Sequence, residues 1–265
     1  MNSKAPGQFW LGVFVFVFCL ALALPVHALC LPPQNLQAAR LDSVVDGDTL
    51  RLTDGRLVRL IGVNTPEIGR DGRLDEPFAV AASQAVERFL GRELLLAEGL
   101  EARDRHGRTL AAVYRAGDRA HLGEYLLTKG LGWHIVVPPN LQDLDCLQKA
   151  EAEARKYRRG VWNTPAAPVR ARDLDKRHAG FMRVSGEVSR VAASRKAIWL
   201  EIDQNLSLRL DKRDLPYFSG IDLDALEGQM LTVRGWLIYR GGQNSRYPAH
   251  KMSLRHPAML ELEKD

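Results

Sequence analysis

The sequence predicts an α+β protein, in which a small β-barrel with helices on one side precedes a second, mostly-β module. Three observations support this prediction: short alternating strand patterns followed by helical patterns, a proline-rich break after residue 163, and strand alternation beyond it. With 265 residues, 46% of them hydrophobic, the chain is long enough for one large domain or two small ones.

The first 28 residues are expected to be a signal peptide. Phe9 to Leu24 is an almost unbroken apolar run, and small residues follow it, with Val26 and Ala28 placed as at a cleavage site. An uncleaved anchor is the alternative, although the run is somewhat short for a span of roughly 20 apolar residues. We therefore expect an exported protein, periplasmic or secreted, without stable membrane association after signal cleavage.

Export changes the meaning of the cysteines. Cys19 lies in the expected signal peptide, which leaves Cys30 and Cys146 in the mature chain. In an oxidising compartment these two residues can form a disulfide that ties the N-terminal segment to the body of the protein. The alternative is two unrelated thiols, one of them buried in a helix.

Residues 29–163 are expected to form the first domain, and its strands come first. Thr49 to Thr53 alternates, Asp54-Gly55 is a strong two-residue hairpin signal, and Arg56 to Val63 returns as a strand. Further strands are expected at Leu94–Leu96 and Thr109–Tyr114.

The helices of this domain are expected in three places. Asp75 is a candidate N-cap for a helix through Phe89, with Pro77 in its first turn, where proline is tolerated. Leu122–Lys129 is a second helix, ended by a glycine. Asn140 is a candidate N-cap for a long final helix through Arg159.

Residues 164–179 are expected to be a linker, since they combine prolines, small residues and charges without apolar periodicity. Residues 180–265 are expected to form a second domain that is nearly all strand, a pattern compatible with the oligonucleotide-binding (OB) fold. Its strand candidates are Val184–Val191, Ile198–Ile202, Leu206–Leu210, Leu231–Tyr239 and Met259–Leu262.

The charge distribution restricts how the first domain can bind a polyanion. Residues 29–163 contain 19 Lys and Arg and 19 Asp and Glu, so most of the formal net charge of +5 lies elsewhere in the chain. Any recognition of phosphate in this domain must therefore come from a few placed arginines rather than from a general basic field.

Two local patterns bear on metal binding and on phosphate binding. Asp46-Gly47-Asp48-Thr49 places two carboxylates directly before a strand, which is either an oxygen-rich corner for a hard cation or a polar turn. Arg59 lies inside the apolar strand Leu57–Ile61, where it either has a buried anionic partner or reaches solvent from an edge strand.

A third pattern is Thr65-Pro66-Glu67, followed further on by Asp104-Arg105-His106-Gly107-Arg108. Taken in order, the three patterns resemble the staphylococcal nuclease (thermonuclease) family. The resemblance covers about Ala39 to Trp162. It implies an OB-like five-stranded β-barrel with three helices.

The resemblance also implies a site and an activity. Asp48, Asn64 and the main-chain carbonyl of Thr65 would bind Ca²⁺, which takes oxygen ligands and acts as a Lewis acid. Glu67 would be the general base, and Arg59 and Arg108 would hold the phosphate and stabilise the transition state. The expected activity is endonucleolytic hydrolysis of DNA and RNA with little sequence specificity, leaving 3′-phosphates.

This chain departs from the family pattern at two places. The best-known members have a second metal-binding aspartate where this chain has Asn64, so one negative charge is lost and calcium affinity should fall. The tyrosines of the nucleotide pocket are also absent, because the corresponding stretch reads Trp133-His134-Ile135-Val136-Val137. Base stacking therefore passes to Trp133 or His134, or is lost.

The second domain permits two interpretations. Trp199, Trp236, Tyr239 and Tyr247, with Arg209, Arg234, Arg240 and Arg246, form a surface for single strands, or the aromatics are core and the arginines a solvated face. Two other functions stay open, namely a non-catalytic nucleic-acid-binding protein with a degenerate nuclease site and an envelope scaffold. A monomer is expected.

Overall fold

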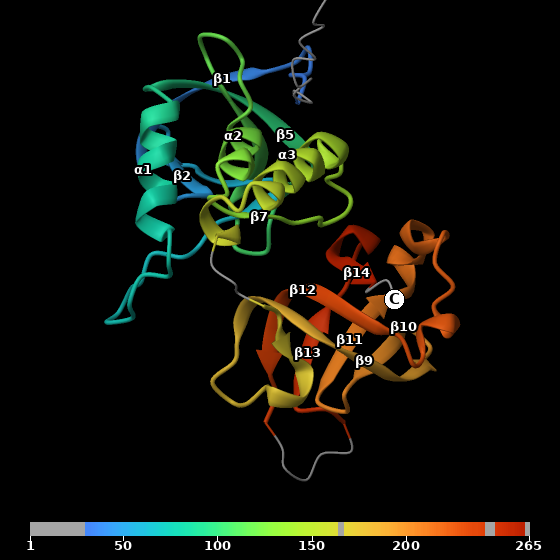
Figure 1. Cartoon of the computed structure of the whole chain (residues 1–265). Coiled ribbons are helices and arrows are strands. Elements are labelled where there is room, and N and C mark those ends of the chain that lie inside the picture. Colours follow the sequence, from blue (N-terminus) through green and yellow to red (C-terminus); the bar gives the residue numbers. More distant parts are fainter. Residues whose placement is uncertain (1–29, 164–166, 242–246, 263–265) are drawn as a thin grey trace, which may run out of the picture.

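The computed structural model describes residues 30–163, 167–241 and 247–262. The expected signal peptide, residues 1–28, lies outside the described residues, as do Arg246 and part of the expected linker. Figure 1 shows two modules, one formed by the first part of the chain and one by the last. Within the described residues, no helix is both long and apolar enough to cross a membrane.

The first module is a closed five-stranded barrel, as the sequence predicts, and its strand order is β1-β2-β3-β6-β5. Strand β1 was not among the strands that we predicted. The β3–β6 pair is parallel, and every other neighbouring pair of strands in this barrel is antiparallel. A separate two-stranded ladder joins β4 to β7. The strands are β1 (Gln37–Asp46), β2 (Thr49–Leu52), β3 (Leu57–Leu60), β4 (Val63–Asn64), β5 (Glu93–Arg103), β6 (Thr109–Arg115) and β7 (Trp133–His134).

Three helices pack on this barrel: α1 (Ala79–Phe89), α2 (Leu122–Thr128) and α3 (Leu144–Lys156). Their apolar faces meet the barrel interior in one buried cluster that includes Val58, Val86, Leu126 and Leu147. Helix α1 also approaches the turn between β1 and β2, where Ala82 faces Gly47.

Two expected helix caps are wrong. Helix α1 begins at Ala79 after Phe78 in a left-handed conformation, because the Asp75 carboxylate accepts the main-chain N–H of Gly69 instead (2.8 Å). Helix α3 begins at Leu144. The side-chain amide of Asn140 bonds to β5 instead, where its oxygen accepts from Glu101 N (2.9 Å) and its nitrogen donates to Glu101 O (3.0 Å).

The second module is a seven-stranded sheet in the order β14-β12-β13-β11-β10-β9-β8, and an additional β12–β9 pairing curls it into a barrel. The mostly-β fold is therefore confirmed, and β13 is a strand that we did not predict. The strands are β8 (Val169–Arg170), β9 (Gly180–Ala193), β10 (Ala197–Ile202), β11 (Leu206–Asp211), β12 (Met230–Tyr239), β13 (His250–Ser253) and β14 (Leu260–Leu262). Five short 3₁₀ helices complete the described elements: η1 (Gly160–Trp162), η2 (Ala171–Asp173), η3 (Lys212–Phe218), η4 (Asp224–Leu226) and η5 (Pro257–Met259).

The segment expected to be a linker contributes to this sheet along its described part. Val169 and Arg170 form β8, which pairs in parallel with β9. Ala171 and Leu174 are buried in the core of the second module. These apolar side chains are spaced too irregularly to give a strand or helix signal, so the composition alone resembled a linker.

The two modules share a packed junction. Ile135 and Val136, which follow β7, are buried in the same cluster as the core of the second module. Val136 N donates to the Met259 sulfur (3.2 Å), and Arg234 of β12 forms a buried ion pair with Glu151 of α3 (2.6 Å). The modules are therefore held together by both apolar and charged contacts.

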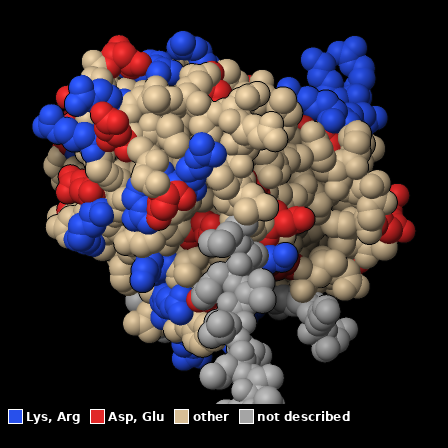
Figure 2. All heavy atoms as spheres, turned by 90° about the horizontal axis from the view of Figure 1, so that it is seen from above, with Lys and Arg blue, Asp and Glu red and all other residues tan. Residues whose placement is uncertain are grey.

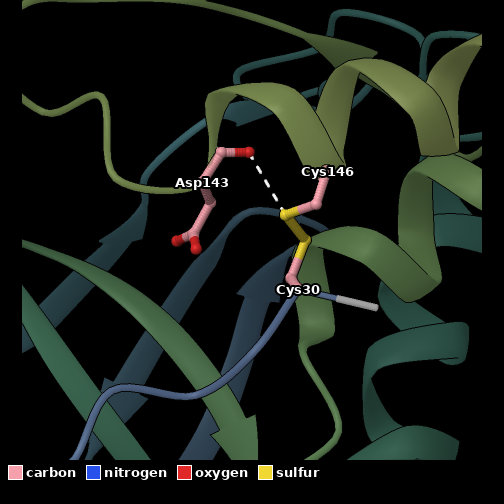
Figure 3. Close-up of side chains that lie close together, drawn as sticks. All are labelled: Cys30, Asp143 and Cys146. Carbon is pink, nitrogen blue, oxygen red and sulfur yellow. Dashed lines mark hydrogen bonds between the residues drawn. A yellow bond between two sulfur atoms is a disulfide. The ribbon is translucent and has the colours of Figure 1, made fainter. Parts of the chain in front are cut away.

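The predicted Cys30–Cys146 disulfide is confirmed. Figure 3 shows Cys30 bonded to Cys146 in the first turn of α3, with the Cys146 sulfur 3.3 Å from the Asp143 carbonyl oxygen. The three residues lie close enough together to resemble a metal site. Because the two sulfur atoms are bonded to each other, this cluster is a disulfide cross-link and not a metal site.

Removal of this disulfide is expected to destabilise the protein substantially. The bridge spans 116 residues of sequence, and a loop of that size lowers the free energy of the native state relative to the unfolded chain by about 4–5 kcal/mol. Urea unfolding with and without a thiol reductant measures the loss. The Cys30→Ser/Cys146→Ser variant should already be destabilised and should not respond to reductant. An unchanged midpoint in fully reduced wild-type protein would contradict the expectation.

Candidate functional site

The candidate site is built on the loop between β1 and β2. Asp48 is 1% exposed, and its carboxylate accepts the main-chain N–H of Thr65 (2.8 Å) and the hydroxyl of Thr49 (3.1 Å). Gly47 allows the chain to turn here, since a Cβ at this position would lie 2.6 Å from the Ala82 Cβ. The loop therefore holds Asp48 against the end of β4.

Arg59 is the centre of the buried cluster. Its Nη1 donates to the carbonyls of Val63 (2.7 Å) and Leu60 (3.2 Å), and its Nη2 lies 3.1 Å from the Asp48 carboxylate. The sequence left open whether this arginine has an anionic partner or reaches solvent. It has a buried partner, because Arg59 is 8% exposed and pairs with Asp48.

Asn64 and Thr65 complete the buried part of the site. The Asn64 Oδ1 accepts from Arg59 Nη2 (3.0 Å), and the Asn64 Nδ2 lies 3.4 Å from the Thr65 carbonyl. The Thr65 hydroxyl oxygen is buried and has no hydrogen-bond partner among the described residues. This corner thus contains carboxylate, amide and carbonyl oxygens and one buried hydroxyl without a partner.

Asp46 is the first carboxylate of the predicted Asp46-Gly47-Asp48 pattern, and it belongs to the site although we did not assign it as a metal ligand. It is 6% exposed, its Oδ1 accepts the main-chain N–H of Asp48 (3.2 Å), and its Oδ2 lies 3.8 Å from Arg70. Burial raises the pKa of Asp48 well above its usual range, and the Asp46 charge acts in the same direction, whereas Arg59 opposes both. The signal for Asp46 was present in the Asp46-Gly47-Asp48 pattern.

These oxygens suit a hard divalent cation. Asp46 and Asp48 are two buried carboxylates; Arg59 pairs with Asp48, and Asp46 has only the more distant Arg70, at 3.8 Å. A cation at this corner would offset the remaining negative charge, and the Asn64 oxygen and the Thr65 carbonyl add neutral oxygen donors of the kind that Ca²⁺ takes. The residues present therefore fit a calcium ion.

Glu67 lies at the exposed rim of the cluster, in the loop between β4 and α1. Its main chain is fixed by Glu76, whose carboxylate accepts Glu67 N–H (2.9 Å) and whose N–H donates to Glu67 O (3.0 Å). Partial loss of water around the carboxylate raises the pKa of Glu67, the Asp46 charge raises it further, and Arg59 opposes. A carboxylate with a raised pKa is a stronger base towards water.

Arg108 reaches the site from the turn before β6. Asp104 fixes its guanidinium, since Nε lies 2.7 Å from the Asp104 carboxylate. The Arg108 Nη1 lies 3.5 Å from the hydroxyl of Thr49, which in turn contacts Asp48. The predicted residues Asp48, Arg59, Asn64, Thr65 and Arg108 are thus brought together by this chain of contacts, and Glu67 interacts with them through its charge.

Of the two residues considered for base stacking, His134 is buried and Trp133 is partly exposed. His134 is 1% exposed, its N–H donates to Glu151 (2.7 Å), and burial together with the Arg234 charge lowers its pKa to about 3. The His134 ring is therefore neutral and too deeply buried to stack on a nucleobase. Trp133 contacts Phe181 of the second module (5.4 Å between ring centroids), so it lies at the junction between the modules.

Comparison with known proteins supports the resemblance to the staphylococcal nuclease family that the sequence motifs indicate. Residues 57–164 match the family model described as staphylococcal nuclease homologue, a range that contains Arg59, Asn64, Glu67 and Arg108. The thermonuclease of Staphylococcus intermedius is 33% identical over 123 residues, which cover 45% of this chain and 72% of that protein. The chain belongs to the staphylococcal nuclease family.

Two further members of the staphylococcal nuclease family are similar to this chain. The thermonuclease of Staphylococcus hyicus is 29% identical over 143 residues, covering 52% of this chain and 83% of that protein. Endonuclease YhcR of Bacillus subtilis (strain 168) is 30% identical over 182 residues, which cover 61% of this chain but 14% of that protein. Asp46 and Asp48 precede the residues matched by the family model, so these two carboxylates are the part of the candidate site that this match does not cover.

Proposed function

We propose that this protein is a calcium-dependent nuclease that hydrolyses phosphodiester bonds in DNA and RNA with little sequence preference. The observation that carries the proposal is the hydrogen-bonded cluster of Asp48, Arg59 and Asn64, with Arg108 joined to it through Thr49. A cleavage site needs cations that are fixed before the phosphate arrives, and the carbonyls of Val63 and Leu60 fix Arg59 in this way.

In the proposed reaction, Glu67 takes a proton from the attacking water as the water oxygen bonds to phosphorus. The bond from phosphorus to the 5′-oxygen breaks, that oxygen takes up a proton from solvent, and a 3′-phosphate remains. Arg59 and Arg108 stabilise the negative charge on the phosphate oxygens, because a guanidinium is a strong charged donor to phosphate. Asp48, Asn64 and the Thr65 carbonyl would hold a calcium ion, which would supply Lewis-acid polarisation of the phosphate.

Export is part of the proposal. The Cys30–Cys146 disulfide supports an oxidising compartment, and the apolar run from Phe9 to Leu24, followed by small residues, supports a signal peptide. Calcium is compatible with that destination, because extracellular calcium sites can work at roughly 10⁻⁴–10⁻³ M. We propose a monomer without stable membrane association.

A calcium-dependence assay tests the function directly. Purified protein should digest single-stranded DNA and RNA when calcium is present and should stop when a chelator is added. Analysis of the product ends should find 3′-phosphates. Cleavage that continues in chelator would overturn the metal requirement, and binding without any cleavage would instead support a non-catalytic nucleic-acid-binding protein.

Asn64→Asp is expected to lower the calcium concentration needed for half-maximal cleavage by about tenfold. The substitution restores a negative charge beside Asp48, and calcium affinity rises with the number of charged ligands. Calcium titration of the cleavage rate measures the shift. Asn163→Asp, which makes the same charge change at an exposed residue, is the matched control. An unchanged calcium requirement in Asn64→Asp would show that Asn64 does not face the metal.

A further inference from the structure

A row of aromatic rings crosses the junction between the modules. Trp133 in β7 lies 5.4 Å from Phe181 in β9, and Phe181 lies 5.3 Å from Trp236 in β12, measured between ring centroids. Phe181 and Trp236 are also direct partners in the β9–β12 pairing. The row therefore runs from the nuclease module onto the sheet of the second module, which Figure 1 shows beside β7.

The first ring of this row is close to the candidate site. In the β4–β7 ladder, Trp133 pairs with Asn64. The Asn64 side chain contacts Arg59, which we assign to phosphate binding. A strand of nucleic acid that leaves this site can therefore reach Trp133 within the same surface.

A cavity of about 200 Å³ lies along the row, and Trp133, Trp162, Phe181 and Arg183 are among the residues that line it. The indole nitrogen of Trp162 is buried and has no hydrogen-bond partner among the described residues. A cavity with aromatic walls and a spare N–H donor is suited to a flat ring that carries acceptor atoms.

Positive charge gathers around the same cavity. The guanidinium of Arg155 lies 4.4 Å from the centre of the Trp162 ring, and that of Arg183 lies 5.3 Å from it. Burial lowers the pKa of Arg183, and the charges of Arg155 and Arg234 act in the same direction, while Glu261 opposes them. Arg155 and Arg183 both pair with Glu261, and Arg234 pairs with Glu151, so the three guanidinium groups exceed their carboxylate partners by one positive charge.

The row continues to an exposed surface. Trp236 is 43% exposed and Ile238 is 55% exposed, and they alternate along β12 with Leu237, which is buried. Tyr239, at the end of the strand, is 40% exposed. The second module thus presents aromatic and apolar surface directly beyond the cavity.

We propose that the row of Trp133, Phe181 and Trp236 binds the bases of a single-stranded nucleic acid whose scissile phosphate lies at Arg59, which makes the second module part of the substrate-binding site. This inference rests on the proposed nuclease function. A single strand matches both the aromatic rings and the arginines of this surface. Unpaired bases stack on aromatic rings whatever the base sequence, and phosphates bind arginine. In a duplex the faces of the bases are covered, so they cannot stack in this way.

The test compares a long and a short substrate. Trp236→Ala should raise the KM for a twelve-residue oligothymidylate about tenfold, which is the loss expected from one base–aromatic stack. It should leave kcat and the KM for the dinucleotide TpT unchanged, because the dinucleotide does not reach Trp236. Trp236→Phe should keep most of the affinity. Tyr157→Ala, which removes a 57% exposed aromatic ring outside the row, is the matched control.

Binding of the fluorescently labelled twelve-residue oligothymidylate in chelator separates this inference from the proposed function. If the protein does not cleave but Trp236→Ala still weakens binding, the nuclease proposal fails and the aromatic row stands. If cleavage is normal and neither binding nor KM changes in Trp236→Ala and Phe181→Leu, the row is not a substrate surface. An equal rise in KM for both substrates would also overturn the inference, since it would show a general structural effect.

Discussion

Replacement of Glu67 by glutamine is expected to slow nucleic-acid cleavage by about 10²- to 10⁴-fold, because an amide cannot take the proton from the attacking water. The substitution keeps the size of the side chain at an exposed position, so the free energy of unfolding should change by no more than about 0.5 kcal/mol. Initial rates on single-stranded DNA at saturating calcium, with a parallel thermal melt, measure both quantities.

Glu76→Gln is the matched control for this prediction. Glu76 lies in the same loop and its carboxylate accepts the Glu67 N–H, a contact that a glutamine oxygen can also make. The variant removes a neighbouring negative charge without removing the proposed base, so its rate should stay within tenfold of the wild type. Equal rates for Glu67→Gln and wild type would show that another group accepts the proton.

Glu151→Gln is expected to lower the free energy of unfolding by about 3–5 kcal/mol. Glu151 and Arg234 are 3% and 4% exposed, and the substitution leaves the Arg234 charge buried without its counter-ion. The main-chain N–H of His134 also bonds to Glu151, so the strand that carries Trp133 depends on the same carboxylate. Urea unfolding followed by tryptophan fluorescence measures the loss.

A double variant distinguishes the two reasons for this loss. In Glu151→Gln/Arg234→Met no buried charge is left uncompensated, so part of the lost stability should return. Arg177→Met, which removes an arginine from a surface ion pair with Asp175, should change stability by less than about 1 kcal/mol. A loss in Glu151→Gln as small as that in Arg177→Met would show that the buried pair does not stabilise the junction.

Local sequence signals predicted the elements that depend on local chemistry. Asp54-Gly55 predicted the β2–β3 hairpin, and Gly55 has the positive φ of 87° that such a turn requires. The caps at Asp75 and Asn140 were predicted wrongly, because their side chains bond to partners outside the helix. Local propensity identifies a side chain that can cap a helix, but it does not show which partner competes for it.

The site, too, was predicted where local sequence signals were sufficient and was missed where folded contacts decide. The order of the motifs predicted that Asp48, Arg59 and Arg108 belong to one site, and the structure brings them together. The role of Asp46 could not be separated from that of Asp48 by sequence, since the two residues share one turn. What distinguishes Asp46 is its contact with the Asp48 N–H, which appears only when the loop is folded.

The junction could not be predicted, because its contacts join residues far apart in the sequence. Glu151 and Arg234 are separated by 83 residues, and each is an ordinary charged residue in its own segment. The pattern of β12 indicated a strand but did not show which face would meet the nuclease module. Both the buried ion pair and the aromatic row follow from that docking.

The balanced surface charge has a consequence for where such an enzyme can work. On the face seen in Figure 2, Lys and Arg side chains are broken up by Asp, Glu and uncharged residues, so no broad basic field covers it. Long-range attraction to a polyanion is weakened by salt over a Debye length of about 8 Å at physiological ionic strength. A protein that relies on a few contact arginines instead gives up capture from a distance, and its affinity for nucleic acid falls less steeply with salt concentration, because it neutralises few phosphates.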